Sequence, residues 1–314
     1  MVYAHLLLPY FSNMADLNTF LIPIPELFSF GECLWYLDRH LDDCTHAIEG
    51  DSVVKALAVN NDLLLFRIAR LGNDLSVTFL EGTPTADNKQ LVEAYIRKWF
   101  DMDADISSFY ELLRKDERLA FMAEAFKGLH VVGINELFEA LAWSIIGQQI
   151  NLAFAFKMKR RITEKFGKTI TCKGKDYFIF PDAAALSVVK PEELRPMQFS
   201  QKKAEYLIGL AKAFVNGELS ETYIESLPDF ESQQKELLKL RGIGVWTANY
   251  ALMKSLHVPE AIPYGDAGIL NAMIELGIIE QKHENAKIEV FFDRFKGWQN
   301  YMVYYLWRSR VVKK

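Results

Sequence analysis

Cysteine is scarce in this sequence. Its 314 residues include three cysteines, Cys33, Cys44 and Cys172, whose spacing matches no metal-binding motif. We therefore expect neither a disulfide framework nor a zinc site, and such sparse use of cysteine is typical of a reducing compartment.

Positive charge and long apolar runs are also in short supply. The formal net charge is −5 and the isoelectric point about 5.8, which weighs mildly against a nucleic-acid partner but is compatible with a local basic face. The apolar run Ala4 to Tyr10 is too short to span a membrane. It also lacks the positive flank of a signal peptide, because the first basic residue apart from His5 is Arg39. We expect no membrane partner, and base no fold prediction on residues before Met14.

The composition is half hydrophobic and a quarter charged, as in globular proteins long enough for two or three packed units. Residues 17–82 are predicted to form strands, because apolar residues alternate with others along 64–69 and 75–79. Gly72-Asn73-Asp74 predicts a hairpin, and Asn60-Asn61 another turn. We expect an antiparallel sheet with one buried face, ending within 83–87.

From Asp87 onward the chain is predicted to be helical. Apolar residues recur at helical spacing in 91–99, 109–113, 137–145 and 154–166, and further helices are predicted over 182–188, from Pro191, over 200–217 and over 230–240. Asn135 is a candidate N-cap, and Gly167 a stop signal. The basic residues Lys157, Lys159, Arg160, Arg161 and Lys165 share one helix, and their simplest interpretation is a solvated face.

Residues 237–269 are the most informative stretch. They read as a helix, a tight hairpin built on Gly242 and Gly244, and a second helix that begins near Val245. Free N–H groups at the start of the second helix make a phosphate site without sequence preference. A single acid, Asp266, follows at the start of the next helix.

This stretch resembles the helix-hairpin-helix plus Gly/Pro-Asp signature of the HhH-GPD superfamily of base excision DNA glycosylases, and within it the 3-methyladenine DNA glycosylase II group. The likeness is carried by G-I-G-V-W-T-A-N-Y over 242–250 and P-Y-G-D-A-G-I over 263–269. It extends to I-I-G-Q-Q-I over 145–150, K-K-A-E-Y-L over 202–207 and the W-x-x-Y-x-x-x-x-L-W pattern over 298–307. A lone pair of glycines would be a weak signal, whereas this combination is specific.

The resemblance implies a mostly α protein with an N-terminal α+β domain, in which an antiparallel sheet domain precedes two helical subdomains. We expect the N-terminal domain over 14–104, one helical subdomain from 105–128 with 267–314, and another over 129–266 that carries the hairpin. In the N-terminal part the likeness is one of architecture only. No cysteine follows Cys172, so the C-terminal iron–sulfur loop of some relatives is absent.

The resemblance implies that Asp266 is the catalytic acid. Breaking an N-glycosidic bond leaves an oxocarbenium-like sugar, which a carboxylate stabilises while it orients or deprotonates a water. One acid suffices when the leaving base already carries positive charge, as alkylated purines do. Without the resemblance, Asp266 would be interpreted as a helix N-cap, and the two roles are compatible.

Three aromatic residues, Trp246, Tyr250 and Trp307, are implied to line the base pocket, with core packing as the alternative for each. Bifunctional relatives place a nucleophilic lysine where this chain has Trp246. Lys254 lies two turns further along and cannot replace it, so we expect no lyase activity. An indole also suits a cationic base through stacking and cation–π attraction.

The resemblance further implies contacts with DNA. The hairpin residues Arg241, Gly242, Ile243, Gly244 and Thr247 are expected at the DNA backbone, with Arg241 where the family usually has proline. Gln149 and Ile150 match the turn that inserts a wedge into the gap left by the extruded nucleotide, where Leu is common. Lys203 is a further candidate contact, although a solvated lysine is the simpler interpretation.

These implications predict a monofunctional glycosylase that releases 3-methyladenine and related N-alkylated purines from double-stranded DNA during base excision repair. We expect a cytoplasmic, nucleoid-associated monomer without a cofactor, apart from a monovalent cation that the family's hairpin often holds through backbone carbonyls. Two alternatives remain: a glycosylase of the same fold for another damaged base, such as hypoxanthine or uracil, and a catalytically silent DNA-binding protein. A small-molecule α/β enzyme is excluded, since no strand precedes Gly242.

Overall fold

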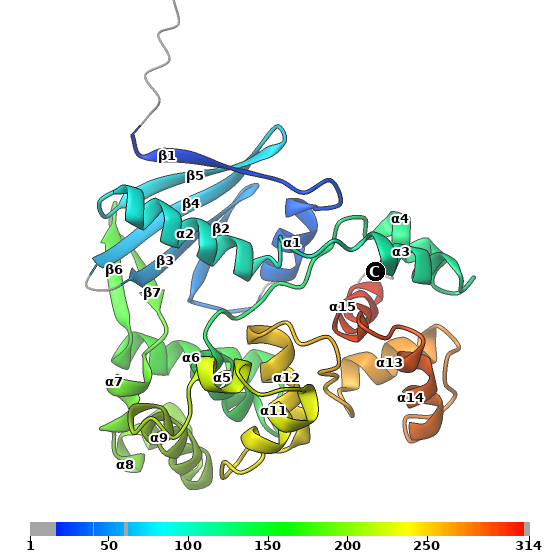
Figure 1. Ribbon diagram of the computed structural model, residues 1–314. Coiled ribbons are helices and arrows are strands. Elements are labelled where there is room, and N and C mark those ends of the chain that lie inside the picture. Colours follow the sequence, from blue (N-terminus) through cyan, green and yellow to red (C-terminus); the bar gives the residue numbers. More distant parts are fainter. Residues whose placement is uncertain (1–16, 40, 60–61, 311–314) are drawn as a thin grey trace, which may run out of the picture.

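The computed structural model describes residues 17–39, 41–59 and 62–310. A twisted antiparallel sheet with two helices forms one part of the molecule, and a body of helices forms the other (Figure 1). This architecture confirms the predicted mostly α fold with an N-terminal α+β domain. In these described ranges, every helix is too short or too polar to span a bilayer.

The N-terminal sheet has five strands in the order β1-β5-β4-β3-β2, all antiparallel. Their bounds are β1 Thr19–Pro23, β2 His46–Glu49, β3 Ser52–Val59, β4 Asp62–Leu71 and β5 Asp74–Glu81. The hairpin predicted at 72–74 joins β4 to β5, with Gly72 at φ +62°. The turn predicted at 60–61 lies outside the described residues.

One face of the sheet is covered by α2 (Ala86–Trp99), as the predicted helical spacing requires. Val92, Ile96 and Trp99 of this helix are buried with Phe66 and Val77 of the strands. The chain therefore turns from strand to helix at 83–87 without leaving this core, with Thr85 as the N-cap of α2.

Three predictions for the sheet and its surroundings were wrong. Residues 30–37 form helix α1 (Phe30–Leu37), capped by Ser29, rather than a strand. The other face of the sheet is not open to solvent, because Leu65 and its neighbours pack under a second hairpin. That hairpin, β6 (Lys168–Cys172) with β7 (Lys175–Ile179), also interrupts a region predicted to be entirely helical.

The remaining helices follow the predicted pattern closely. Their bounds are α3 Ser107–Arg114, α4 Ala120–Ala125, α5 Leu137–Gly147, α6 Leu152–Phe166, α7 Ala183–Ser187, α8 Pro191–Leu194, α9 Gln201–Val215, α10 Glu221–Glu225, α11 Phe230–Leu237, α12 Val245–Ser255, α13 Ala267–Glu275, α14 Asn285–Asp293 and α15 Gln299–Ser309. Asn135 is not the N-cap of α5: its amide donates to the Tyr95 carbonyl, and the Leu137 N–H donates to Glu221.

Helix α6 does not present all of its basic residues to solvent. Lys159 is buried, because its ammonium lies 3.3 Å from an Asp43 carboxylate oxygen and 3.0 Å from one of Glu139. The solvated-face interpretation is wrong for this residue, which joins the N-terminal unit to α5. A buried ammonium is tolerated here because two carboxylates compensate its lost hydration.

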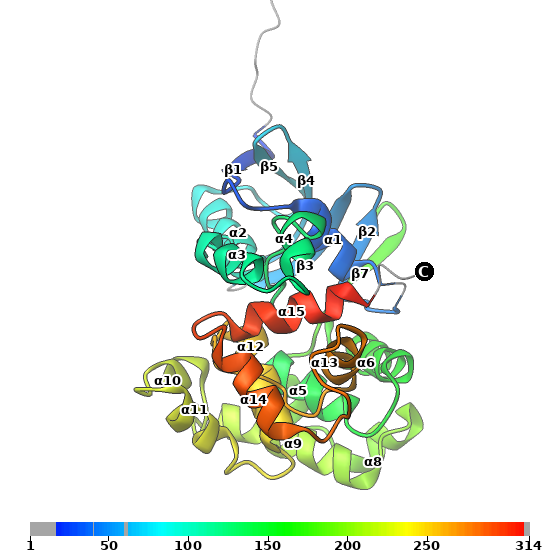
Figure 2. The same cartoon turned by 90° about the vertical axis from the view of Figure 1, so that its right-hand side faces the viewer.

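Helix α15 lies between the sheet unit and the other helices (Figure 2). Its Tyr301 hydroxyl donates to Asp101, its Tyr305 hydroxyl lies 2.8 Å from that of Tyr110, and its Arg308 pairs with Glu32. Each partner belongs to an earlier part of the chain, so α15 is fixed against elements that precede it in the sequence.

A second set of polar contacts joins the loop after α3 to the end of α14. Asp116 is buried and accepts hydrogen bonds from Arg118 and from Arg294, while Arg118 also donates to the Gly277 carbonyl. The Arg118 guanidinium lowers the pKa of Asp116, burial raises it, and the Arg294 guanidinium lowers it again. The net result is a pKa well below the usual range of an aspartate.

Replacing Asp116 by Asn should lower the free energy of unfolding by about 1–2 kcal/mol at pH 7. The pKa is lowered in the fold, so the contribution is fully present above the unfolded pKa of about 4, shrinks as pH falls below it, and is lost only when pH falls through the still lower folded pKa. Urea unfolding at pH 7 and pH 2 measures this. Glu124→Gln, which breaks an exposed pair with Arg114, is the control and should change stability little. An equal loss for Asp116→Asn at both pH values would contradict the electrostatic origin.

Candidate functional site

The hairpin between α11 and α12 has the tight geometry that its two glycines predict. Gly242 has φ +91°, and a Cβ built there would lie 2.4 Å from the ring of Tyr206 on α9. Gly244 has φ −100° and is the N-cap of α12, with nothing within 4 Å of such a Cβ. The first glycine is thus required by conformation and packing, and the second by neither.

The five hairpin residues divide between surface and core. Arg241 is exposed, with its guanidinium 3.9 Å from Glu205 and 5.6 Å from the ring centre of Tyr206. The side chains of Ile243 and Thr247 are buried. The first N–H groups of α12 have no partner within the helix and follow Arg241 closely in the chain, an arrangement suited to an anion.

Asp266 is the N-cap of α13, and one of its oxygens is fixed twice. Oδ1 accepts from the Ile269 N–H at 3.0 Å and from the Trp307 indole N–H at 2.9 Å. Within the described chain, Oδ2 accepts no hydrogen bond, and the residue is half-buried. The side chain is therefore held in one orientation with an oxygen free for another donor or a positive charge.

Gly268 makes the contact between Asp266 and Trp307 possible. A Cβ at this position would lie 2.9 Å from Asp266 Oδ1 and about 3.0 Å from the indole ring. No role for this glycine was predicted from the sequence, although its place in the P-x-G-D-x-G-I segment was a usable signal. Its lack of a side chain allows α15 to approach the N-terminus of α13.

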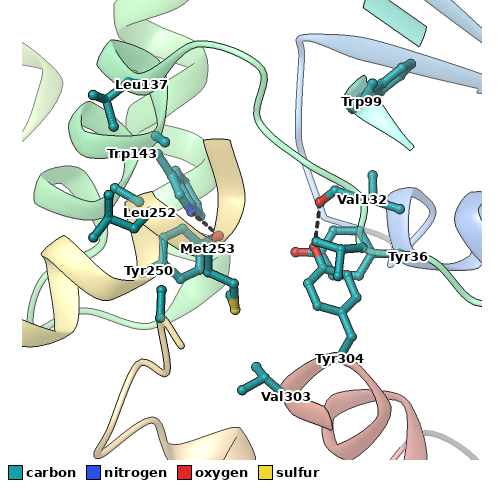
Figure 3. Close-up of a cluster of buried hydrophobic side chains, with 14 of the residues drawn as sticks. Tyr36, Trp99, Val132, Leu137, Trp143, Tyr250, Leu252, Met253, Val303 and Tyr304 are labelled. Carbon is teal, nitrogen blue, oxygen red and sulfur yellow. Dashed lines mark hydrogen bonds between the residues drawn. The ribbon is translucent and has the colours of Figure 1, made fainter. Parts of the chain in front are cut away.

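The aromatic residues form two groups. Trp246 stacks on Tyr250 with ring centres 5.1 Å apart, and the Tyr250 hydroxyl accepts from the Trp143 indole N–H at 3.1 Å. Trp307 packs on Tyr304 with ring centres 5.3 Å apart. Figure 3 shows Tyr250 and Trp143 on one side and Tyr304 on the other. Trp246 and Trp307 are partly exposed, whereas Tyr250 is buried.

Behind these rings lies a charged interior that sequence reasoning did not foresee. The buried Lys254 ammonium donates to the hydroxyls of Tyr36 and Tyr304 and to the Val132 carbonyl. Burial alone would raise the pKa of Tyr36, but the Lys254 ammonium and the Arg39 guanidinium outweigh it and lower that pKa to about 7. Lys254 is thus occupied by its partners.

Arg39 lies beside this group. Its guanidinium is 4.2 Å from the ring centre of Tyr36, and it lines a cavity of about 60 Å³ together with Tyr36, Tyr250 and Lys254. In the ranges that the structure describes, this guanidinium makes no hydrogen bond and no ion pair. It is therefore a partly exposed hydrogen-bond donor with no acceptor among the described residues, close to the aromatic groups.

The turn between α5 and α6, residues 148–151, carries the predicted wedge and is called the wedge turn below. Gln149 is exposed at its tip with φ +57°, and Ile150 is partly buried behind it. Gln148, not singled out from the sequence, donates from Nε2 to the Gly242 carbonyl at 2.9 Å. The wedge turn and the hairpin thus lie side by side. Lys203 is not simply solvated, since its ammonium donates to the Ile146 carbonyl.

Three carbonyls of the hairpin region take part in hydrogen bonds within the protein. Those of Leu240, Gly242 and Gly244 already accept hydrogen bonds from Ile243, Gln148 and Ala248. Across the described residues, no cluster of three or more His, Cys, Asp and Glu side chains is suited to a metal. The monovalent cation stays a prediction.

Gly242→Ala should destabilise the protein by about 1–3 kcal/mol, because the added Cβ meets the Tyr206 ring and the positive φ disfavours any side chain. Gly244→Ala is the matched control and should cost less than about 1 kcal/mol. Urea unfolding of both variants measures the difference. Equal losses would show that the hairpin does not depend on the conformation of Gly242.

Comparisons with known proteins cover nearly the whole chain. The family described as HhH-GPD superfamily base excision DNA repair protein matches residues 142–297, and the 8-oxoguanine DNA glycosylase, N-terminal domain, matches residues 24–141. The second match lies where the sequence motifs indicated a likeness of architecture only. The likeness to base excision glycosylases therefore extends over more of the chain than its motifs indicated.

Individual relatives agree with these matches. A DNA-3-methyladenine glycosylase of Bacillus subtilis (strain 168) is 36% identical over 294 residues, which cover 93% of this chain and 97% of the relative. The 3-methyladenine DNA glycosylase structure from Archaeoglobus fulgidus has the same fold, with a TM-score of 0.79 at 20% identity over 94% of this chain and 99% of that one. An apo 8-oxoguanine glycosylase/lyase from Clostridium acetobutylicum gives a TM-score of 0.72 at 21% identity, over 92% and 95% of the two chains.

Proposed function

The chain belongs to the HhH-GPD superfamily of base excision DNA repair glycosylases, and from this premise we propose that it releases N-alkylated purines, chiefly 3-methyladenine, from double-stranded DNA. The observation that carries the proposal is Asp266, held at the start of α13 by the Trp307 indole with one oxygen free. The name of the Bacillus subtilis relative supports the same lesion.

In the proposed reaction, Asp266 acts on the sugar. As the glycosidic bond breaks, positive charge develops at the anomeric carbon, and a carboxylate in a partly desolvated site stabilises it. The free oxygen of Asp266 also accepts a proton from the attacking water. Its orientation is set beforehand by the Ile269 N–H and the Trp307 indole, so little reorganisation is needed in the transition state.

The proposed base pocket uses the aromatic groups. An extruded base costs a few kcal/mol of lost stacking in the duplex, which stacking on Trp246 and Trp307 offsets. A cationic alkylated base gains further from the electron-rich indole face. The hairpin N–H groups and Arg241 hold the phosphates of the distorted strand, and the exposed Gln149 enters the vacated space.

The proposed enzyme is monofunctional. A lyase step requires an amine that attacks the sugar carbon, and Trp246 supplies none. Lys254 is buried and donates hydrogen bonds to two phenol hydroxyls and a carbonyl. Burial has the largest effect on the pKa of Lys254 and lowers it. Water is the remaining nucleophile, and the product is an abasic site without strand cleavage.

Asp266→Asn should reduce single-turnover release of 3-methyladenine by about 10²–10³-fold, because the amide does not compensate the developing positive charge. Asparagine is also a good N-cap, so stability should change by less than about 1 kcal/mol. Base release by chromatography, with duplex affinity and urea unfolding, measures these effects.

The control for this variant is Asp182→Asn, which replaces the N-cap of α7 in the same way. It should leave release unchanged. If Asp266→Asn released base at the parent rate, Asp266 would be a helix cap alone. Absence of release by the parent from any damaged duplex, with binding intact, would favour the catalytically silent DNA-binding protein.

A second substrate class is favoured by Arg39. Its guanidinium has donors without acceptors in the described structure and lies near Tyr250 and Tyr36. A positive group there repels a cationic base and attracts a carbonyl oxygen. A neutral oxopurine such as hypoxanthine would satisfy it, whereas 3-methyladenine would not.

Arg39→Leu should raise the ratio of 3-methyladenine release to hypoxanthine release by about tenfold, the effect of one charge-assisted hydrogen bond. Paired single-turnover assays on the two duplexes measure this ratio. Arg114→Leu, on the exposed face of α3, is the control and should leave it unchanged. An unchanged ratio in Arg39→Leu would exclude contact between this guanidinium and the base.

A further inference from the structure

The wedge turn and the hairpin are joined by a single side chain. Gln148 Nε2 lies 2.9 Å from the Gly242 carbonyl oxygen and 3.3 Å from Thr247 Oγ1. Both acceptors are rigidly placed: Gly242 packs on the Tyr206 ring, and Thr247 is buried in the first turn of α12. The amide therefore fixes the start of the wedge turn to the element that the proposed function places on the DNA backbone.

The helices on either side of the wedge turn do not need this side chain. At the end of α5, the Gln148 backbone N–H donates to Ile145, and Lys203 donates to the Ile146 carbonyl at 2.8 Å. At the start of α6, the side chain of Asn151 accepts from the Phe154 N–H. Both helix ends are satisfied by other groups, so the Gln148 amide serves the link to the hairpin.

The link acts on a turn whose geometry is otherwise unfavourable. Gln149, next to Gln148, has φ +57°, a left-handed backbone conformation that residues other than glycine and asparagine rarely adopt. Such a conformation persists only where its surroundings hold it. On one side of Gln149 that support is the Gln148 amide, and on the other it is the N-cap residue Asn151.

We propose that Gln148 is a positioning residue that couples the hairpin to the wedge turn, so that binding of the strand by the hairpin sets the depth at which Gln149 and Ile150 enter the duplex. This inference rests on the proposed function, since it assumes that both loops meet DNA. It assigns Gln148 an effect on nucleotide extrusion rather than on affinity, because Gln148 itself need not touch the phosphates.

The test compares Gln148→Met with Gln90→Met. The first variant keeps the approximate size of the side chain but removes the donor to the Gly242 carbonyl, and the second makes the same change at an exposed position of α2, away from the wedge turn and the hairpin. Extrusion is read from the fluorescence of 2-aminopurine placed next to a lesion in a duplex. Duplex affinity, single-turnover release and urea unfolding are measured on the same proteins.

We expect Gln148→Met to lose most of the fluorescence change and to slow release by about 10–100-fold, the usual effect of a small misplacement. Its duplex affinity should stay within about threefold of the parent. Unchanged fluorescence and release in Gln148→Met would overturn the proposal, as would equal losses in Gln90→Met. If the parent released no base, the glycosylase proposal would fail, while the fluorescence comparison would still decide the role of Gln148.

Discussion

The position of α15 is the constraint on which the rest of the structure depends. Three tyrosine hydroxyls on this helix are buried, and each must find a partner: Tyr301 finds Asp101, Tyr304 finds Val132 and Lys254, and Tyr305 finds Tyr110. These partners come from three separate segments of the chain. Because an unpaired buried hydroxyl is costly, the helix has one acceptable rotation and height, and this places the Trp307 indole on Asp266.

The same helix explains how Asp266 can be both a helix cap and the proposed catalytic acid. A carboxylate that only capped α13 would be free to change rotamer, since one backbone N–H holds it weakly. The second donor, on α15, fixes the rotamer, and Gly268 gives the indole room to reach it. The site therefore depends on contact between elements that are about 40 positions apart in the sequence, from Asp266 to Trp307.

Local signals in the sequence predicted much of this arrangement. The alternation in β4 and β5, the turn at Gly72 and the start of α12 after Gly244 follow from short-range propensities and were confirmed. The burial of Lys159 and the link from Gln148 to Gly242 could not be predicted, because each depends on a partner distant in the sequence. Helix α1 was missed because apolar residues at 30–37 do not distinguish a short helix from a strand.

The hairpin β6–β7 has a consequence for how this architecture can change over time. It is inserted between α6 and α7, yet its Ile170, Cys172 and Tyr177 cover Val54 and Leu65 of the sheet. The hydrophobic unit of the sheet is thus discontinuous in the chain. Recombination between relatives that exchanged only the N-terminal segment would pair the sheet of one protein with the β6–β7 hairpin of another. Residues in β3, β4, β6 and β7 are therefore expected to vary together, and a cut between sheet and helices is not a neutral boundary.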